Sequence, residues 1–136
     1  MKYPLILFCC LFFFLQTFAQ KKACDTVYRA LDTLAQYPGG PEALIKFMDT
    51  DMKQAINDCY ALDSTMITSM TIRLLIDKKG KVLDAVFEEV ELSKNCRERL
   101  RKKLTAMKSW TPAQYKGQAV CSYYSWLVGG VIWEDQ

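Results

Sequence analysis

The chain has 136 residues, with 18 basic and 15 acidic side chains, no histidine and a formal net charge of +3. So weak a positive charge gives no electrostatic case for binding nucleic acid or an acidic membrane surface. Without histidine, a serine or cysteine nucleophile lacks its most common general base, so we expect a protein that is not an enzyme.

The first 19 residues have the pattern of a secretory signal peptide. Lys2 precedes an apolar run of about fifteen residues, numbers 4–18, and Ala19 is a small residue at a plausible cleavage point. A membrane-spanning helix usually needs about 20 apolar residues. We therefore expect cleavage and export to the periplasm; the alternative is that residues 4–18 remain in the inner membrane as an anchor.

Four cysteines follow this segment: Cys24, Cys59, Cys96 and Cys121. An even number in an exported chain predicts two disulfides, and four cysteines allow three pairings, among which the sequence does not decide. None has the paired spacing of a zinc site, and no histidine is present to complete one. We expect neither a metal nor another cofactor.

Residues 20–36 are predicted to contain a short N-terminal helix. Val27, Leu31 and Leu34 fall at spacings of four and three, which is one apolar stripe. A Tyr-Pro-Gly-Gly turn ends this segment, and the remaining residues, 37–136, are expected to form the main domain. Pro41 suits the first turn of a helix near 41–57, because its missing N–H would be unpaired there anyway.

A β-hairpin is the clearest element of the main domain. In "MTIRLLID", residues 70–77, apolar and polar side chains alternate as in a strand. Residues 77–80 form the turn, with Gly80 supplying a positive φ, and the returning strand covers residues 81–90. The alternation shifts near Asp84, which indicates a bulge.

A second long helix and a last strand complete the domain. Ser93 is a suitable N-cap, and the apolar stripe that follows includes Cys96, Leu100 and Leu104. Pro112 terminates this region. Residues 119–133 are rich in β-branched and aromatic side chains and predict a strand. Its core face is expected to carry Val120, Ser122, Tyr124, Trp126 and Val128, with Cys121, Tyr123, Ser125 and Leu127 on the other face.

Four pieces in this order resemble the C-terminal domain of TonB, in the variant found in stand-alone TonB-like chains: "YPGGPEALIKFM", "IDKKGKVLDAVF", "SWTP" and "YKGQAV". The resemblance covers about 100 residues, numbers 37–133. It implies an α+β fold in which a three-stranded antiparallel sheet has helices packed on one face. It also implies a cell envelope with an outer membrane.

A full transducer of the TonB type would consist of an inner-membrane anchor, a long proline-rich spacer and a domain like this one. The present chain has only 4 prolines. The resemblance therefore favours a protein-binding or peptide-binding module linked to TonB-dependent transmembrane transport. The alternatives are an inner-membrane-anchored component of an energy transducer, and a structural or inhibitory envelope domain.

The last strand is the expected binding site, because TonB-like domains pair an extended receptor peptide with a sheet edge. We expect this edge at Val120, Cys121, Ser122, Tyr123, Tyr124 and Ser125. The expected partner is a segment of a TonB-dependent outer-membrane receptor or another envelope protein. Since an uncovered apolar edge invites aggregation, the alternative is that the tail or the second chain of a homodimer covers it.

Overall fold

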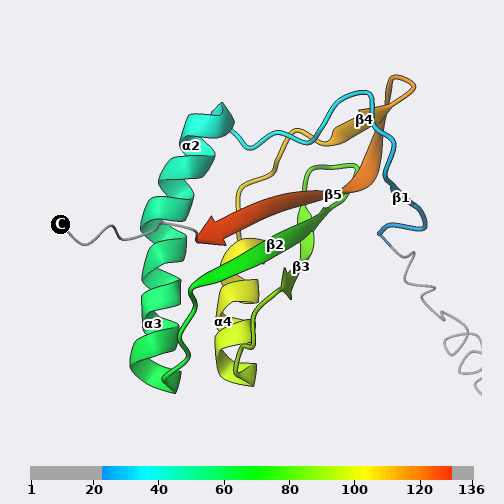
Figure 1. The fold of residues 1–136 in the computed structure, drawn as a ribbon. Helices are drawn as coiled ribbons and strands as arrows, with labels where there is room; N and C mark the ends of the chain where they lie inside the picture. Colours follow the sequence, from blue (N-terminus) through cyan, green and yellow to red (C-terminus); the bar gives the residue numbers. More distant parts are fainter. Residues whose placement is uncertain (1–22, 130–136) are drawn as a thin grey trace, which may run out of the picture.

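The computed structural model describes residues 23–129. The predicted signal peptide, its alternative as an anchor, and residues 130–133 of the predicted last strand lie outside the described residues. The elements are β1 (Val27–Tyr28), α2 (Gly40–Phe47), a π-helical turn η2 (Met48–Met52), α3 (Lys53–Asp63), β2 (Ser69–Ile76), β3 (Val82–Glu88), α4 (Lys94–Thr105), β4 (Ala113–Tyr115) and β5 (Gln118–Gly129) (Figure 1). No helix within residues 23–129 combines the length and the hydropathy needed to cross a membrane.

The predicted α+β class is confirmed, but the expected three-stranded antiparallel sheet is wrong in detail. The strands follow the order β1-β5-β2-β3, and β4 pairs with β5 outside this path. β2 is antiparallel to both β3 and β5, whereas β1 runs parallel to β5, so the sheet is mixed. The reason for the error is length: β1 has two residues and β4 three, too few to show any periodicity.

The helix predicted within residues 20–36 is also wrong, because residues 23–36 form β1, bends and two isolated bridges at Thr33 and Gln36. Their backbone groups pair with the region around β4: the N–H of Asp32 donates to the carbonyl of Gln114, and that of Gln36 to the carbonyl of Thr111, both at 2.9 Å. Leu34, assigned to the buried stripe, is 62% exposed. Hydrogen bonds to a distant segment therefore override the local helical spacing.

The helix predicted near 41–57 is confirmed and is longer, since α2, η2 and α3 follow one another without interruption to Asp63. Figure 1 shows them as one column beside α4. Leu44, Met52 and Cys59 are buried along this column. Together with the apolar stripe of α4 they cover one face of the sheet, as the resemblance implied, and the core lies between the two layers.

The predicted hairpin is confirmed in its strands, turn and bulge. Every second residue of β2, from Met70 to Ile76, is buried. In the turn, the Asp77 carboxylate accepts hydrogen bonds from the N–H groups of Lys79 and Lys81 at 2.8 and 2.9 Å. The register shifts between positions 75 and 76, which leaves Leu83 as the extra residue, directly before the predicted position of the bulge.

Candidate functional site

β5 is the strand on which the expected site lies, and its two edges are used differently along its length. Ser122 pairs with Ile76 of β2 on one edge and with Tyr28 of β1 on the other. Val120 pairs with β4 and Cys121 with β1. The first three of the predicted peptide-binding residues therefore already have strand partners on the chain itself.

The other three predicted residues, Tyr123, Tyr124 and Ser125, pair with β2 on one edge only. Within residues 23–129 no strand pairs with the opposite edge of β5 from Tyr123 to Gly129. We call these seven residues the free edge. Residues 126–129 were not among the predicted site residues, although they continue the same alternation.

The side chains of the free edge point to the two faces as predicted. Tyr124, Trp126 and Val128 are partly buried and pack against the core, whereas Tyr123, Ser125 and Leu127 face outward. Leu127 is 64% exposed. A strand added here would thus meet aromatic and aliphatic side chains on both faces.

The composition of the free edge differs from that of β3, which is the outer strand at the opposite side of the sheet. β3 contains a bulge and two acidic residues, Asp84 and Glu88, and Asp84 pairs with Arg101 of α4 at 3.0 Å. Charges and bulges are the devices by which proteins prevent strand addition to an edge. The free edge of β5 contains no charged residue and no proline, so these devices are absent from residues 123–129.

A charged contact crosses the outer face of the sheet and ties three strands together. The guanidinium of Arg73 in β2 lies 2.7 Å from the Glu88 carboxylate of β3 and 4.5 Å from the ring centroid of Tyr123 in β5. The hydrogen bond to Glu88, followed by the charge of Glu88, raises the pKa of Arg73 above its usual value. Arg73 therefore stays charged and holds the Tyr123 ring at the start of the free edge.

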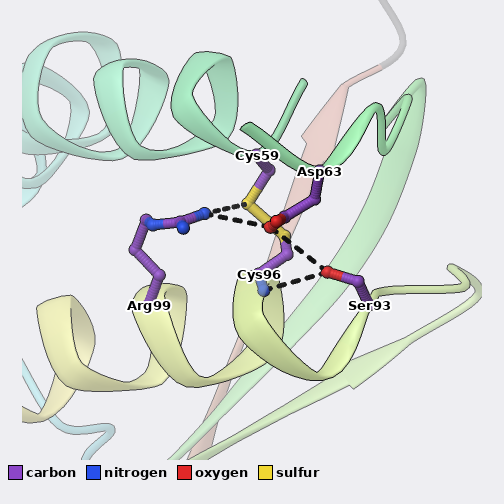
Figure 2. A network of polar contacts seen from close by, with 5 residues as sticks. All are labelled: Cys59, Asp63, Ser93, Cys96 and Arg99. Atoms are coloured by element: carbon purple, nitrogen blue, oxygen red, sulfur yellow. Dashed lines mark hydrogen bonds and ion pairs between the residues drawn. A yellow bond between two sulfur atoms is a disulfide. The ribbon is translucent and has the colours of Figure 1, made fainter. Parts of the chain in front are cut away.

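The two predicted disulfides are present, and their pairing is Cys24–Cys121 and Cys59–Cys96. Disulfides of this kind are typical of an oxidising, exported compartment. Figure 2 shows the second bond between α3 and α4, where Asp63 accepts hydrogen bonds from Arg99 and Ser93 at 3.2 and 3.3 Å. This disulfide crosslinks the two helices. Because Cys59 and Cys96 are both fully buried, its sulfur atoms are inaccessible to reagents in solvent.

Within residues 23–129, no group of three histidine, cysteine or carboxylate side chains is placed so that it could bind one metal ion.

No family model matches the chain, and neither a curated protein nor a solved structure matches it. The resemblance to the TonB C-terminal domain therefore stays a prediction that rests on the four sequence pieces.

Proposed function

We propose that this chain is a non-enzymatic protein-binding module of the periplasm that captures an extended segment of another envelope protein at the free edge of β5. The observation that carries the proposal is the contrast between the two sides of this strand. From Tyr123 to Gly129 one side is fully paired with β2, and on the other no strand within residues 23–129 is paired. The segment is long and uncharged, which favours strand addition.

The backbone supplies the affinity in this mode of binding, and the side chains supply selectivity. The partner would place alternate side chains beside Trp126 and Val128 on the helix-covered face and beside Leu127 on the outer face. Because these neighbours are apolar, we expect the partner segment to carry apolar residues at alternate positions. A charged side chain there would lose its hydration without gaining an opposite charge.

The identity of the partner follows from the resemblance alone. A TonB-like domain would bind a segment near the plug of a TonB-dependent outer-membrane receptor, which would link this chain to transport across the outer membrane. The disulfides fit a location in the oxidising periplasm. Such a role needs a chain that reaches the outer membrane, which a cleaved signal peptide would allow.

The proposal is tested by titrating the oxidised, isotope-labelled protein with synthetic peptides from the N-terminal segments of TonB-dependent receptors and following its backbone amide resonances. We expect the largest changes in the amides of residues 123–129. Substitution Leu127→Lys should abolish these changes, because an ammonium group on the edge blocks an incoming strand.

The matched control is Leu62→Lys, which makes the same leucine-to-lysine change in α3, outside the free edge. Leu62 is 69% exposed and Leu127 is 64% exposed, so the two leucines are similarly accessible to solvent. Binding by the Leu62→Lys protein should equal that of the unchanged protein. The proposal fails if no receptor peptide shifts the β5 amides, or if Leu62→Lys and Leu127→Lys weaken binding equally.

A further inference from the structure

The two disulfides differ in their access to solvent. Cys59 and Cys96 are both 0% exposed, whereas Cys24 is 8% and Cys121 5% exposed. Cys24 and Cys121 both line a groove of about 590 Å³, which lies between residues 23–28, the turn from β2 to β3, and the beginning of β5. A small thiol can therefore approach Cys24–Cys121 along this groove, while Cys59–Cys96 is enclosed by its own helices.

The charged residues around the groove also favour attack by a thiolate on Cys24–Cys121. Lys78 and Lys79, both exposed on the β2–β3 turn, border it, and Asp25 contributes the exposed acidic group. The carboxylate of Asp77, also on the lining, is occupied by two backbone N–H groups of its own turn. Since the attacking species in thiol–disulfide exchange is an anion, two lysines on the border of the groove assist its approach.

Cys24–Cys121 holds the chain's own short strand on β5. β1 makes only a two-residue parallel ladder, in which Val27 pairs with Cys121 and Tyr28 with Ser122. The chain is fixed again from Asp32 onward, where its N–H donates to Gln114 at 2.9 Å and its carboxylate accepts from the N–H of Lys116 at 2.6 Å. Before Asp32, the disulfide is therefore the covalent restraint on residues 23–28. The other contacts that hold them are this short ladder and the Tyr28 ring, which lies 5.3 Å from that of Tyr115.

β1 lies on the same edge of β5 as the free edge and directly continues it. Ser122, which pairs with β1, is the residue before Tyr123, and β2 occupies the opposite side of both. If residues 23–28 leave, the unpaired edge grows from 123–129 to 121–129. It then includes Cys121 and Ser122, two of the predicted residues that are covered in the oxidised protein, while Val120 stays paired with β4.

We propose that Cys24–Cys121 is a thiol–disulfide exchange site for a dithiol, and that its reduction uncovers the part of the β5 edge that β1 occupies. The functional consequence of this inference rests on the proposed function: the number of β5 residues that can pair with a partner would depend on whether Cys24–Cys121 is oxidised or reduced. Cys59–Cys96 stays oxidised throughout and keeps α3 and α4 together.

The exchange balances with a dithiol as the only co-reactant. A thiolate of the dithiol attacks Sγ of Cys24, the more exposed of the two cysteines, and the S–S bond breaks. Cys121 leaves as a thiolate and takes up a proton. The second thiol of the dithiol then attacks the mixed disulfide and releases Cys24 as a thiol, so the dithiol is oxidised by two electrons as the protein disulfide is reduced.

The first experiment treats the folded, oxidised protein with increasing dithiothreitol, traps free thiols with iodoacetamide and maps them by peptide mass spectrometry. We expect Cys24 and Cys121 to become alkylated together, at a rate about tenfold or more above that of Cys59 and Cys96, because exchange depends on access. Equal rates, or earlier alkylation of Cys59 and Cys96, would overturn the assignment of the exchange site.

The second experiment measures hydrogen–deuterium exchange in the selectively reduced protein and in Cys24→Ser/Cys121→Ser. Peptides covering residues 23–28 and 121–122 should lose protection by about tenfold or more, as expected for a short unpaired segment. Peptides covering residues 32–36, β2 and β3 should keep their protection. Unchanged protection at 23–28 after reduction would mean that β1 stays in place without the bond, which contradicts the proposal.

Peptide binding separates this inference from the proposed function. Receptor peptides should shift the amides of residues 121–122 only in the reduced protein, and those of 123–129 in both states. If no peptide binds in either state but residues 23–28 are released on reduction, the proposed function fails and the exchange site stands. If peptides bind with the same footprint in both states, the proposed function stands and the redox control fails.

Discussion

The backbones of Gly80 and Trp110 are in direct contact, which fixes the β2–β3 turn on the segment after α4. The N–H of Trp110 donates a 2.8 Å hydrogen bond to the carbonyl of Gly80, and a Cβ placed on Gly80 would overlap the carbonyl oxygen of Trp110. Trp110 in turn is 3% exposed, and its ring lies 4.9 Å from that of Tyr124 on β5. Trp110 thus connects the β2–β3 turn to β5 through buried contacts.

Gly80→Ala should therefore destabilise the protein by about 3 kcal/mol, combining the cost of a positive φ with displacement of a hydrogen-bonded segment. Gly117→Ala is the control, because Gly117 also has a positive φ, of 75°, but a Cβ placed there would meet no atom within 4 Å. It should cost only about 1 kcal/mol. Denaturant unfolding measures both, and equal losses would contradict the role of the Trp110 contact.

Ser93 is expected to stabilise α4 through its hydroxyl. Its Oγ accepts a 3.0 Å hydrogen bond from the N–H of Cys96 and donates to Asp63, as Figure 2 shows. Ser93→Ala should lower the free energy of unfolding by about 1 kcal/mol, the usual value of an N-cap. The control Thr50→Ala removes an exposed hydroxyl that bonds only locally, and should change it by less than about 0.5 kcal/mol.

Stability should be nearly independent of pH between about pH 6 and about pH 9. The chain has no histidine, the side chain that ordinarily titrates in this range, and the four cysteines of residues 23–129 are in disulfides. Arg73 has a raised pKa in the folded state, caused first by its hydrogen bond to Glu88. For a base with a raised pKa, the stabilisation is fully present below the unfolded-state pKa and is lost only as the pH rises through the folded-state pKa.

The pH prediction is checked by denaturant unfolding at several pH values, in the oxidised protein. A slope of about 1.4 kcal/mol per pH unit would correspond to one proton taken up or released on unfolding. Such a slope near pH 7 would contradict the prediction and identify a titrating group that the contacts described above do not include.

The elements that were predicted correctly are those whose structure depends on residues close together in the sequence. The alternation of β2, the positive φ at Gly80 and the cap at Ser93 each depend on neighbours within about ten positions. The faces of β5 were predictable for the same reason, since Tyr124 and Trp126 must point away from Ser125. Local pattern was thus sufficient to predict the hairpin, the helices after residue 40 and the orientation of β5.

The features that the sequence did not predict depend on segments far apart in the chain. Val27 of β1 pairs with Cys121 of β5, and a ladder of two residues is too short to produce a recognisable pattern in the sequence. The apolar spacing of Val27 and Leu31 suggested a helix, but Leu31 packs against the core from an irregular segment. The extent of the free edge depends on where β1 ends, so the sequence could not predict that the unpaired residues of β5 are Tyr123–Gly129.

Ser122 offers a last test, because it is the residue at which β1, β5 and β2 meet. It is 1% exposed on the core face, and its Oγ has no hydrogen-bond partner within residues 23–129. Burying an unpaired hydroxyl costs about 1–3 kcal/mol. Ser122→Ala should therefore raise the free energy of unfolding by about 1 kcal/mol, the opposite sign to the same change at Ser93. A loss on Ser122→Ala in denaturant unfolding would mean that the hydroxyl bonds to a group outside residues 23–129.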